Sequence, residues 1–174
     1  MPFDPMWRQA DVRAVIPLLG GIPQEIGGRY PVFAAYPYAL DPAYREILRR
    51  VEARAAVRFV FPEDDASPAH LDEKVLALLH IAAFAIFDWS GWNANVAFEF
   101  GLALGEVSSR PAMRGVHRRS RLAIFIRTGA ESDVPSDLGG MGRNRYADLG
   151  DLGTQLEAIL SARFPLRPAS RRPP

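Results

Sequence analysis

The 174-residue sequence predicts an α/β fold built on one parallel sheet. Two observations lead to this prediction. Short apolar runs alternate with amphipathic segments between residues 30 and 163, and one of the runs, residues 83–87, is apolar at every position. A strand that is apolar on both faces is typical of a parallel sheet with helices on both sides, and strands that alternate with helices give this arrangement through right-handed crossovers.

The first half of the chain contains two units in which a strand is followed by a helix. Residues 30–35 predict the first strand, and residues 57–61, rich in β-branched and aromatic side chains, predict the second. Asp41–Pro42 and Ser67–Pro68 each mark the start of a helix. The inward-facing residues of these helices recur every three or four positions: Tyr44, Ile47, Leu48, Val51 and Ala55 in the first, and Leu71, Val75, Leu78 and Leu79 in the second.

The second half continues the alternation. Residues 83–87 form the third strand, and a third helix runs from Asn95 to about Glu106. Residues 121–126 predict a fourth strand, and Tyr146 lies on a short fifth strand. A last helix is capped by Asp151, and its inward-facing residues are Leu152, Leu156, Ile159 and Leu160.

These elements predict a flavodoxin-like three-layer fold with a parallel five-stranded sheet in the order 2-1-3-4-5. In such a sheet, ligands bind outside the carboxyl ends of the strands at the switch point, which here lies between the first and third strands. The domain is expected to span residues 29–164. An N-terminal arm, residues 1–28, precedes it, and a disordered Pro- and Arg-rich tail, residues 165–174, follows it.

Composition argues against several classes of protein. The formal net charge of +1 makes nucleic acid an unlikely partner, although the run of Arg without acids between Glu106 and Glu131 suggests a local basic patch or a solvated loop. The chain has no cysteine and only three histidines, which lack metal spacing, so no metal site is expected. No apolar stretch reaches the ~20 residues of a membrane span, and no export signal is present, which predicts a cytoplasmic protein without membrane contact.

Polar side chains gather where the third strand passes into the third helix. Asp88 ends the strand, and Glu99 lies about one turn into the helix. Asn95 and Glu99 are four residues apart, so they share one helix face and lie ~6 Å apart along its axis. The neighbours Phe98 and Phe100 desolvate the charged form of Glu99, which predicts a raised pKa for this carboxyl, a property of catalytic acids and bases.

The same residues also fit structural roles. Most glutamates on helices are solvated, and Asp88, Asn93 and Asn95 are residue types that equally often form turns or helix caps. Trp89 and Trp92 could cover the edge of the sheet. Two tryptophans in one short Gly- and Asn-containing loop nevertheless exceed what a cap requires, and their faces suit a base or a nicotinamide ring.

Residues 88–103 resemble the signature of bacterial TIR-like domains, which reads Asp, then Asn-Pro-Asn-Val, then Glu-Leu-Gly-x-Ala. More distantly, they are similar to the Asp-to-Glu motif of nucleoside 2-deoxyribosyltransferases. Both families are flavodoxin-like and break an N-glycosidic bond with a helix glutamate, the position of Glu99 here. Two looser similarities, at 35–38 and 134–138, extend the resemblance over about residues 30–163. The sequence departs from the signature where Ala94 replaces the usual Pro and Phe100 the usual Leu or Ile.

The resemblance implies an enzyme that hydrolyses the nicotinamide–ribose bond of NAD, with NAD as substrate and no further cofactor. Glu99 would be catalytic, because a carboxylate can stabilise or capture the oxocarbenium-like ribose. The implied substrate-binding residues hold the ribose, the phosphates and the rings: Tyr36, Tyr38, Asp88, Trp89, Ser90, Trp92, Asn93 and Asn95. The family context implies a bacterial antiviral defence effector that becomes active as a homo-oligomer or with an activating protein partner.

Two other functions fit the same residues. A nucleoside or nucleotide N-glycosidase, or a deoxyribosyltransferase, would also use Glu99 and differs only in its substrate. A non-catalytic TIR-like module that binds a nucleotide signal or a partner would keep its biological activity after Glu99→Ala and would never release nicotinamide.

Overall fold

The computed structural model of the chain describes residues 29–40, 42–64, 69–109, 121–130 and 141–164. Within these residues, five strands form a single sheet in the order β2-β1-β3-β4-β5, and every neighbouring pair is parallel. The predicted α/β class and strand order are therefore confirmed. The strands are β1 (Tyr30–Ala35), β2 (Val57–Val60), β3 (Phe84–Asp88), β4 (Leu122–Arg127) and β5 (Arg143–Tyr146).

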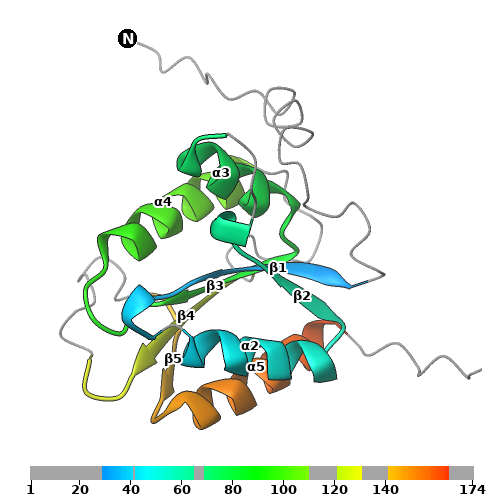
Figure 1. Ribbon diagram of the computed structural model, residues 1–174, viewed down its shortest axis with the longest axis vertical. Coiled ribbons are helices and arrows are strands. Elements are labelled where there is room, and N and C mark those ends of the chain that lie inside the picture. Colours follow the sequence, from blue (N-terminus) through cyan, green and yellow to red (C-terminus); the bar gives the residue numbers. More distant parts are fainter. Residues whose placement is uncertain (1–28, 41, 65–68, 110–120, 131–140, 165–174) are drawn as a thin grey trace, which may run out of the picture.

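Helices cover both faces of the sheet. The pair α2 and α5 lies on one face, and α3 and α4 lie on the other (Figure 1). Across the described residues, no helix combines the length and the apolar character that a membrane crossing needs. The helices are α2 (Ala43–Arg54), α3 (Leu71–Ile81), α4 (Ala94–Ser109) and α5 (Leu149–Arg163), and the short 3-10 turns η2 (Tyr38–Leu40) and η3 (Pro62–Asp64) follow β1 and β2.

The sheet divides the core into two clusters, because successive side chains of a strand point to opposite faces. In β1, Val32 and Ala34 pack on the side of α2 and α5, whereas Phe33 and Ala35 pack on the side of α3 and α4. The four apolar residues of β3, Phe84 to Phe87, are buried, as the uninterrupted apolar run predicts, and Asp88 at the end of the strand is buried with them. A central strand packed on both faces holds its carboxyl end in a fixed position, and the residues that follow β3 start from there.

The structure corrects the predicted starts of two helices. The cap of α5 is Asp148 and not Asp151: the Asp148 carboxylate accepts a hydrogen bond of 2.9 Å from the backbone N–H of Asp151. The helix α3 begins at Leu71 behind a capping box in which Glu73 accepts a hydrogen bond of 3.1 Å from the backbone N–H of His70. Both differences arise from local side-chain contacts, and α2 and α4 begin within one residue of their predicted starts.

One predicted core position is wrong, and several predictions fall on parts of the chain that are not described. Leu71 is 57% exposed, because it is the first residue of α3 and precedes the buried stripe of that helix. The predictions that lie outside the described residues are the N-terminal arm (1–28), the helix cap Asp41, the Ser67–Pro68 start signal, the basic loop (110–120), the 134–138 segment and the tail (165–174). The residue that precedes α2 as its N-cap is Pro42.

Candidate functional site

The candidate site lies at the edge of the sheet formed by the carboxyl ends of β1, β2 and β3. In the observed order, β1 lies between β2 and β3. Neighbouring strands are about 4.8 Å apart, so residues that follow β2 and β3 start only about 10 Å from each other. Tyr36 follows β1, η3 follows β2, and residues 89–93 connect β3 to α4. Three separate segments therefore contribute side chains to one small region.

Asp88 is the centre of a sealed polar network. It has no exposed area. One carboxylate oxygen accepts the backbone N–H of Ser90 over 2.8 Å, and the other accepts the hydroxyl of Tyr146 over 2.7 Å. Burial raises the pKa of Asp88 above its usual value, and the hydrogen bonds from Ser90 and Tyr146 oppose this rise. The carboxylate therefore joins β3 to β5 across the intervening β4.

Further hydroxyl groups surround this carboxylate. The Ser90 hydroxyl lies 3.0 Å from that of Tyr146 and accepts the backbone N–H of Arg127 over 2.7 Å. The Tyr44 hydroxyl is buried, and burial, followed by the charge of Asp88, raises its pKa well above the usual value. For Tyr146, burial and then Asp88 raise the pKa. Asp88 thus fixes the position of Ser90. For Asp88 to contact a ribose hydroxyl, as the resemblance implies, these hydrogen bonds would have to open.

The two tryptophans of the connecting segment have different surroundings. Trp89 is 3% exposed, and its ring meets that of Phe100 edge to face with centroids 5.6 Å apart. Trp92 is 64% exposed, and its ring lies 6.2 Å from that of Trp89. Between them, Gly91 has a φ of 81°, a left-handed conformation that favours glycine. This turn buries Trp89 in the core and leaves Trp92 as the open aromatic surface.

Asn93 caps α4, and Asn95 lies in its first turn. The side-chain oxygen of Asn93 accepts the backbone N–H groups of Asn95 and Val96 over 2.9 and 3.2 Å. This is the structural role that asparagine commonly has at helix starts. The side chain of Asn95 is exposed. Asn95 is therefore open to a ligand, whereas the oxygen of Asn93 is already used.

Glu99 lies in the second turn of α4 and is half-buried. Burial, followed by the negative charge of Glu63, raises its pKa to about 7. The direction agrees with the prediction, but the sequence did not reveal the contribution of Glu63. Phe100 is buried next to Glu99, whereas Phe98 is exposed. At neutral pH the Glu99 carboxyl is close to half ionised, so it can act in either protonation state.

The first loop contributes Tyr36 and Tyr38. Tyr36 is buried and stacks on Tyr44, with ring centroids 4.2 Å apart and an angle of 7° between the rings. Its hydroxyl accepts a hydrogen bond of 3.0 Å from the Nε–H of Arg45. Tyr38 lies in η2 and is exposed. Of the two predicted ring contacts, Tyr38 presents the open surface and Tyr36 supports the loop from within.

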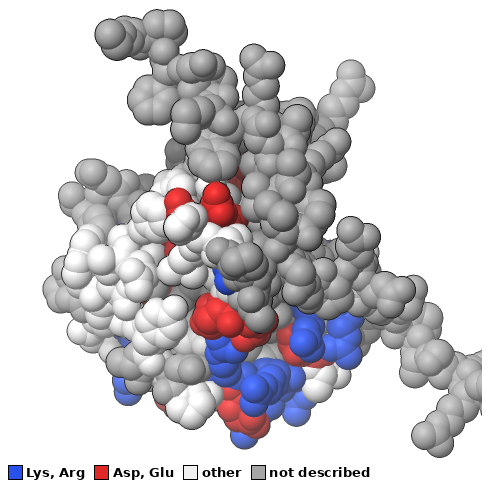
Figure 2. Space-filling view, turned by 45° about the horizontal axis from the view of Figure 1, so that its top comes forward, with Lys and Arg blue, Asp and Glu red and all other residues white. Residues whose placement is uncertain are grey.

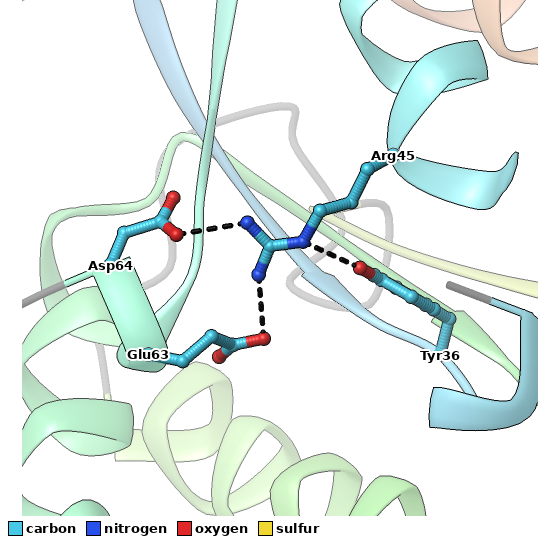
Figure 3. A network of polar contacts seen from close by, with 4 residues as sticks. All are labelled: Tyr36, Arg45, Glu63 and Asp64. Carbon is cyan, nitrogen blue, oxygen red and sulfur yellow. Dashed lines mark hydrogen bonds and ion pairs between the residues drawn. The ribbon is translucent and has the colours of Figure 1, made fainter. Parts of the chain in front are cut away.

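Sequence reasoning missed the group formed by Arg45, Glu63 and Asp64. The Arg45 guanidinium lies 2.8 Å from a carboxylate oxygen of Glu63 and 2.8 Å from one of Asp64 (Figure 3). It also lies 4.2 Å above the ring of Phe61. A signal was present, because three acids, Glu63, Asp64 and Asp65, come shortly after the second strand, and the carboxyl end of that strand meets the same edge of the sheet. The Arg45 group therefore connects the ends of β1 and β2.

Charged side chains of both signs lie next to each other on the surface around α2 (Figure 2). Three further ion pairs involve residues of α2: Arg50 with Glu46, Arg54 with Glu157, and Arg58 with Glu52. The described residues contain no group of three or more His, Asp or Glu that could hold a metal ion. Arg121, which belongs to the run of Arg between Glu106 and Glu131, donates hydrogen bonds to the carbonyls of Ala82 and Ala83. In the three ion pairs around α2, opposite charges thus offset one another.

No protein-family model matches the chain, and no curated protein does. Among solved structures, the chain is similar to a metazoan TIR-STING receptor from C. gigas in complex with 2′,3′-cGAMP, with a TM-score of 0.56 and 21% sequence identity. The match covers 75% of this chain and 39% of the receptor chain, so this chain corresponds to well under half of that receptor. A likeness at this identity shows a shared fold, and it supports the TIR-like fold that the resemblance at residues 88–103 implied.

Proposed function

We propose that the chain is a TIR-like N-glycosidase that cleaves the nicotinamide–ribose bond of NAD, with Glu99 as the catalytic carboxylate. The observation that carries the proposal is the state of Glu99. It is a half-buried carboxyl at the switch point of the sheet, with a pKa raised to about 7. Strongly shifted carboxyls in such positions are concentrated at functional sites.

The reaction requires only one bond to break before water enters. The C1′–N bond breaks, its electron pair moves to the pyridinium nitrogen, and neutral nicotinamide leaves. The ribose becomes an oxocarbenium-like cation, which the ionised Glu99 stabilises or captures. Water then adds to C1′ and releases a proton, which gives ADP-ribose. The positive charge of the bound pyridinium favours the ionised form of Glu99, so substrate binding would promote the reactive state of the carboxyl.

Other side chains of the site would bind and orient the dinucleotide. Trp92 and Tyr38 offer exposed ring faces, and Asn95 lies one helical turn before Glu99 with an exposed side chain. Asp88 and Ser90 would act as positioning residues, because their network fixes the segment that carries Trp92. A role in antiviral defence, with activation by self-assembly or by a protein partner, is part of the same proposal.

The test is nicotinamide release from NAD by purified protein at low and high concentration, with Glu99→Gln and Glu46→Gln in parallel. Glu46 is an exposed glutamate of α2 paired with Arg50, so its amide variant controls for the loss of a surface charge. We expect release by the wild type and Glu46→Gln and at least about a thousandfold less by Glu99→Gln. No release at any concentration would overturn the proposal, as would equal release by Glu99→Gln. Free base released from nucleosides and not from NAD would favour the nucleoside N-glycosidase.

A second candidate is a module that binds a nucleotide without turnover. The similar C. gigas structure favours it, because that receptor is in complex with 2′,3′-cGAMP. If this candidate is correct, calorimetry will show that wild type and Glu99→Gln bind a cyclic dinucleotide equally well, while neither releases nicotinamide. Turnover of NAD that depends on Glu99 would contradict it.

A further inference from the structure

The negative charge of Glu63 acts on Glu99, although 36 positions separate the two residues in the sequence. Val60, at the end of β2, belongs to the same core cluster as Val96 and Phe100, which lie on either side of Glu99 in α4. The turn η3 begins two residues after Val60 and contains Glu63. The end of β2 and the first turns of α4 therefore contribute to the same apolar layer on one face of the sheet.

Arg45 fixes the side chain of Glu63. The Arg45 side chain is only 19% exposed, and its guanidinium donates hydrogen bonds of 2.8 Å to both Glu63 and Asp64. Its Nε–H donates to the hydroxyl of Tyr36 (Figure 3), and its face lies over the ring of Phe61. Glu63, Asp64, Tyr36 and Phe61 thus all help to set its orientation. A guanidinium held in this way presents a rigid fork, and Glu63 is bound in one geometry rather than moving freely in solvent.

The Arg45 group keeps a net negative charge. The two carboxylates, Glu63 and Asp64, and the single guanidinium of Arg45 together carry one net negative charge. An ionised Glu99 adds a second negative charge. Glu63 is the group whose charge acts on Glu99 and favours its protonated form. Asp88 is sealed in its own network, and His80 and Glu106, near the other end of α4, pair with each other at 2.9 Å.

We propose that Glu63, fixed by Arg45, determines the substrate specificity of the site by disfavouring N-glycosides whose leaving base carries an added negative charge and by favouring those with a cationic base. The inference rests on the proposed N-glycosidase function. Glu63 acts through space, since two nearby unit charges at a protein surface interact strongly enough to change a rate about tenfold. A base with its own carboxylate meets this repulsion, whereas a neutral carboxamide on the same ring does not.

The first experiment is independent of turnover. The ionisation of Glu99 is followed by carbon NMR of the side-chain carboxyl in wild type, Glu63→Gln and Glu46→Gln. Gln at position 63 keeps an oxygen that can accept the Arg45 hydrogen bond, so the turn η3 is expected to remain in place. We expect the pKa of Glu99 to fall below its value of about 7 in Glu63→Gln and to stay unchanged in Glu46→Gln. An unchanged pKa in Glu63→Gln would overturn the electrostatic role of Glu63.

The second experiment compares two dinucleotides that differ at one group of the base. NAD carries a carboxamide on the pyridinium ring, and nicotinic acid adenine dinucleotide carries a carboxylate there. We expect wild type and Glu46→Gln to prefer NAD in kcat/KM, and Glu63→Gln to reduce this preference about tenfold. An undiminished preference in Glu63→Gln would overturn the specificity role.

Failure of the proposed function would be recognised separately. If the wild type cleaves neither dinucleotide, the N-glycosidase proposal fails, and the affinities of the two dinucleotides are compared by calorimetry instead. A preference for NAD that falls in Glu63→Gln would then support the role of Glu63 in binding alone. An equal preference in both proteins, or no binding of either compound, would overturn it.

Discussion

The segment that leads from β3 into α4 carries one acid and one tryptophan that are sealed, and a second acid and tryptophan that are open. Asp88 and Trp89 are buried, whereas Trp92 is largely exposed and Glu99 is half-buried. Burial raises the pKa of both acids. Hydrogen bonds from Ser90 and Tyr146 compensate Asp88, while Glu99 receives the repulsion of Glu63. The same residue types therefore have a structural role in one pair and, in the proposed function, would face the substrate in the other.

Removing the two tryptophans in turn should give the largest contrast in stability. Trp89→Ala removes a buried ring that packs against Phe100, so we expect a loss of about 3–5 kcal/mol in the free energy of unfolding. Trp92→Ala removes an exposed ring and should cost less than about 0.5 kcal/mol, while it weakens NAD binding. Urea denaturation and a binding titration measure the two effects. Equal destabilisation by both variants would show that the pair is not divided in this way.

Replacing the two acids, Asp88 and Glu99, should give a smaller difference in stability than replacing the two tryptophans. In Asp88→Ala, the Tyr146 hydroxyl and the backbone N–H of Ser90 lose their acceptor inside the protein, which should cost about 2–4 kcal/mol. Glu99→Gln should change stability by less than about 0.5 kcal/mol at a pH where Glu99 is protonated. Urea denaturation at pH 5 compares the two variants. A stable Asp88→Ala protein would mean that the buried network contributes little to folding.

The smallest effect is a pH dependence of stability. Glu99 has a pKa of about 7 in the folded chain, against a usual value of 4.5. The folded state therefore binds the proton more tightly than the unfolded state, and the stability of the wild type falls as pH rises from about 4.5 to 7. Relative to Glu99→Gln, which lacks this titration, we expect the wild type to lose about 2 kcal/mol over that range. Unfolding curves of both proteins at several pH values test it, and parallel pH profiles would contradict the raised pKa.

The sequence predicted the fold well because the apolar pattern is local. The uninterrupted run at residues 83–87 and the three- and four-residue spacings on the helices require no knowledge of distant contacts. The starts of the helices were predicted less accurately than the helices themselves. For α5, the cap could be Asp148 or Asp151, because either aspartate can accept the capping hydrogen bond.

The residues predicted for the candidate site came from two short segments of the chain, residues 36–38 after β1 and residues 88–99. Residues 88–99 form one continuous segment, so the cluster was visible in the sequence. The sealing of Asp88 was not, because Tyr146 comes from 58 positions further along. The Arg45–Glu63 contact likewise joins segments 18 positions apart, on different elements. Local residue types cannot reveal which carboxylate a distant hydroxyl or guanidinium will reach.

The cap of α4 has a consequence for phosphate groups. The beginning of a helix commonly holds a phosphate, because its first backbone amides are free and its dipole favours negative charge. Here the side-chain oxygen of Asn93 already accepts the amides of Asn95 and Val96. A pyrophosphate that approached the start of α4 would compete with this side-chain oxygen for the same two amides. To bind there, it would have to displace the Asn93 cap from the first turn of the helix. The amides at the start of α4 that could bind an anion are thus already occupied by the side-chain oxygen of Asn93.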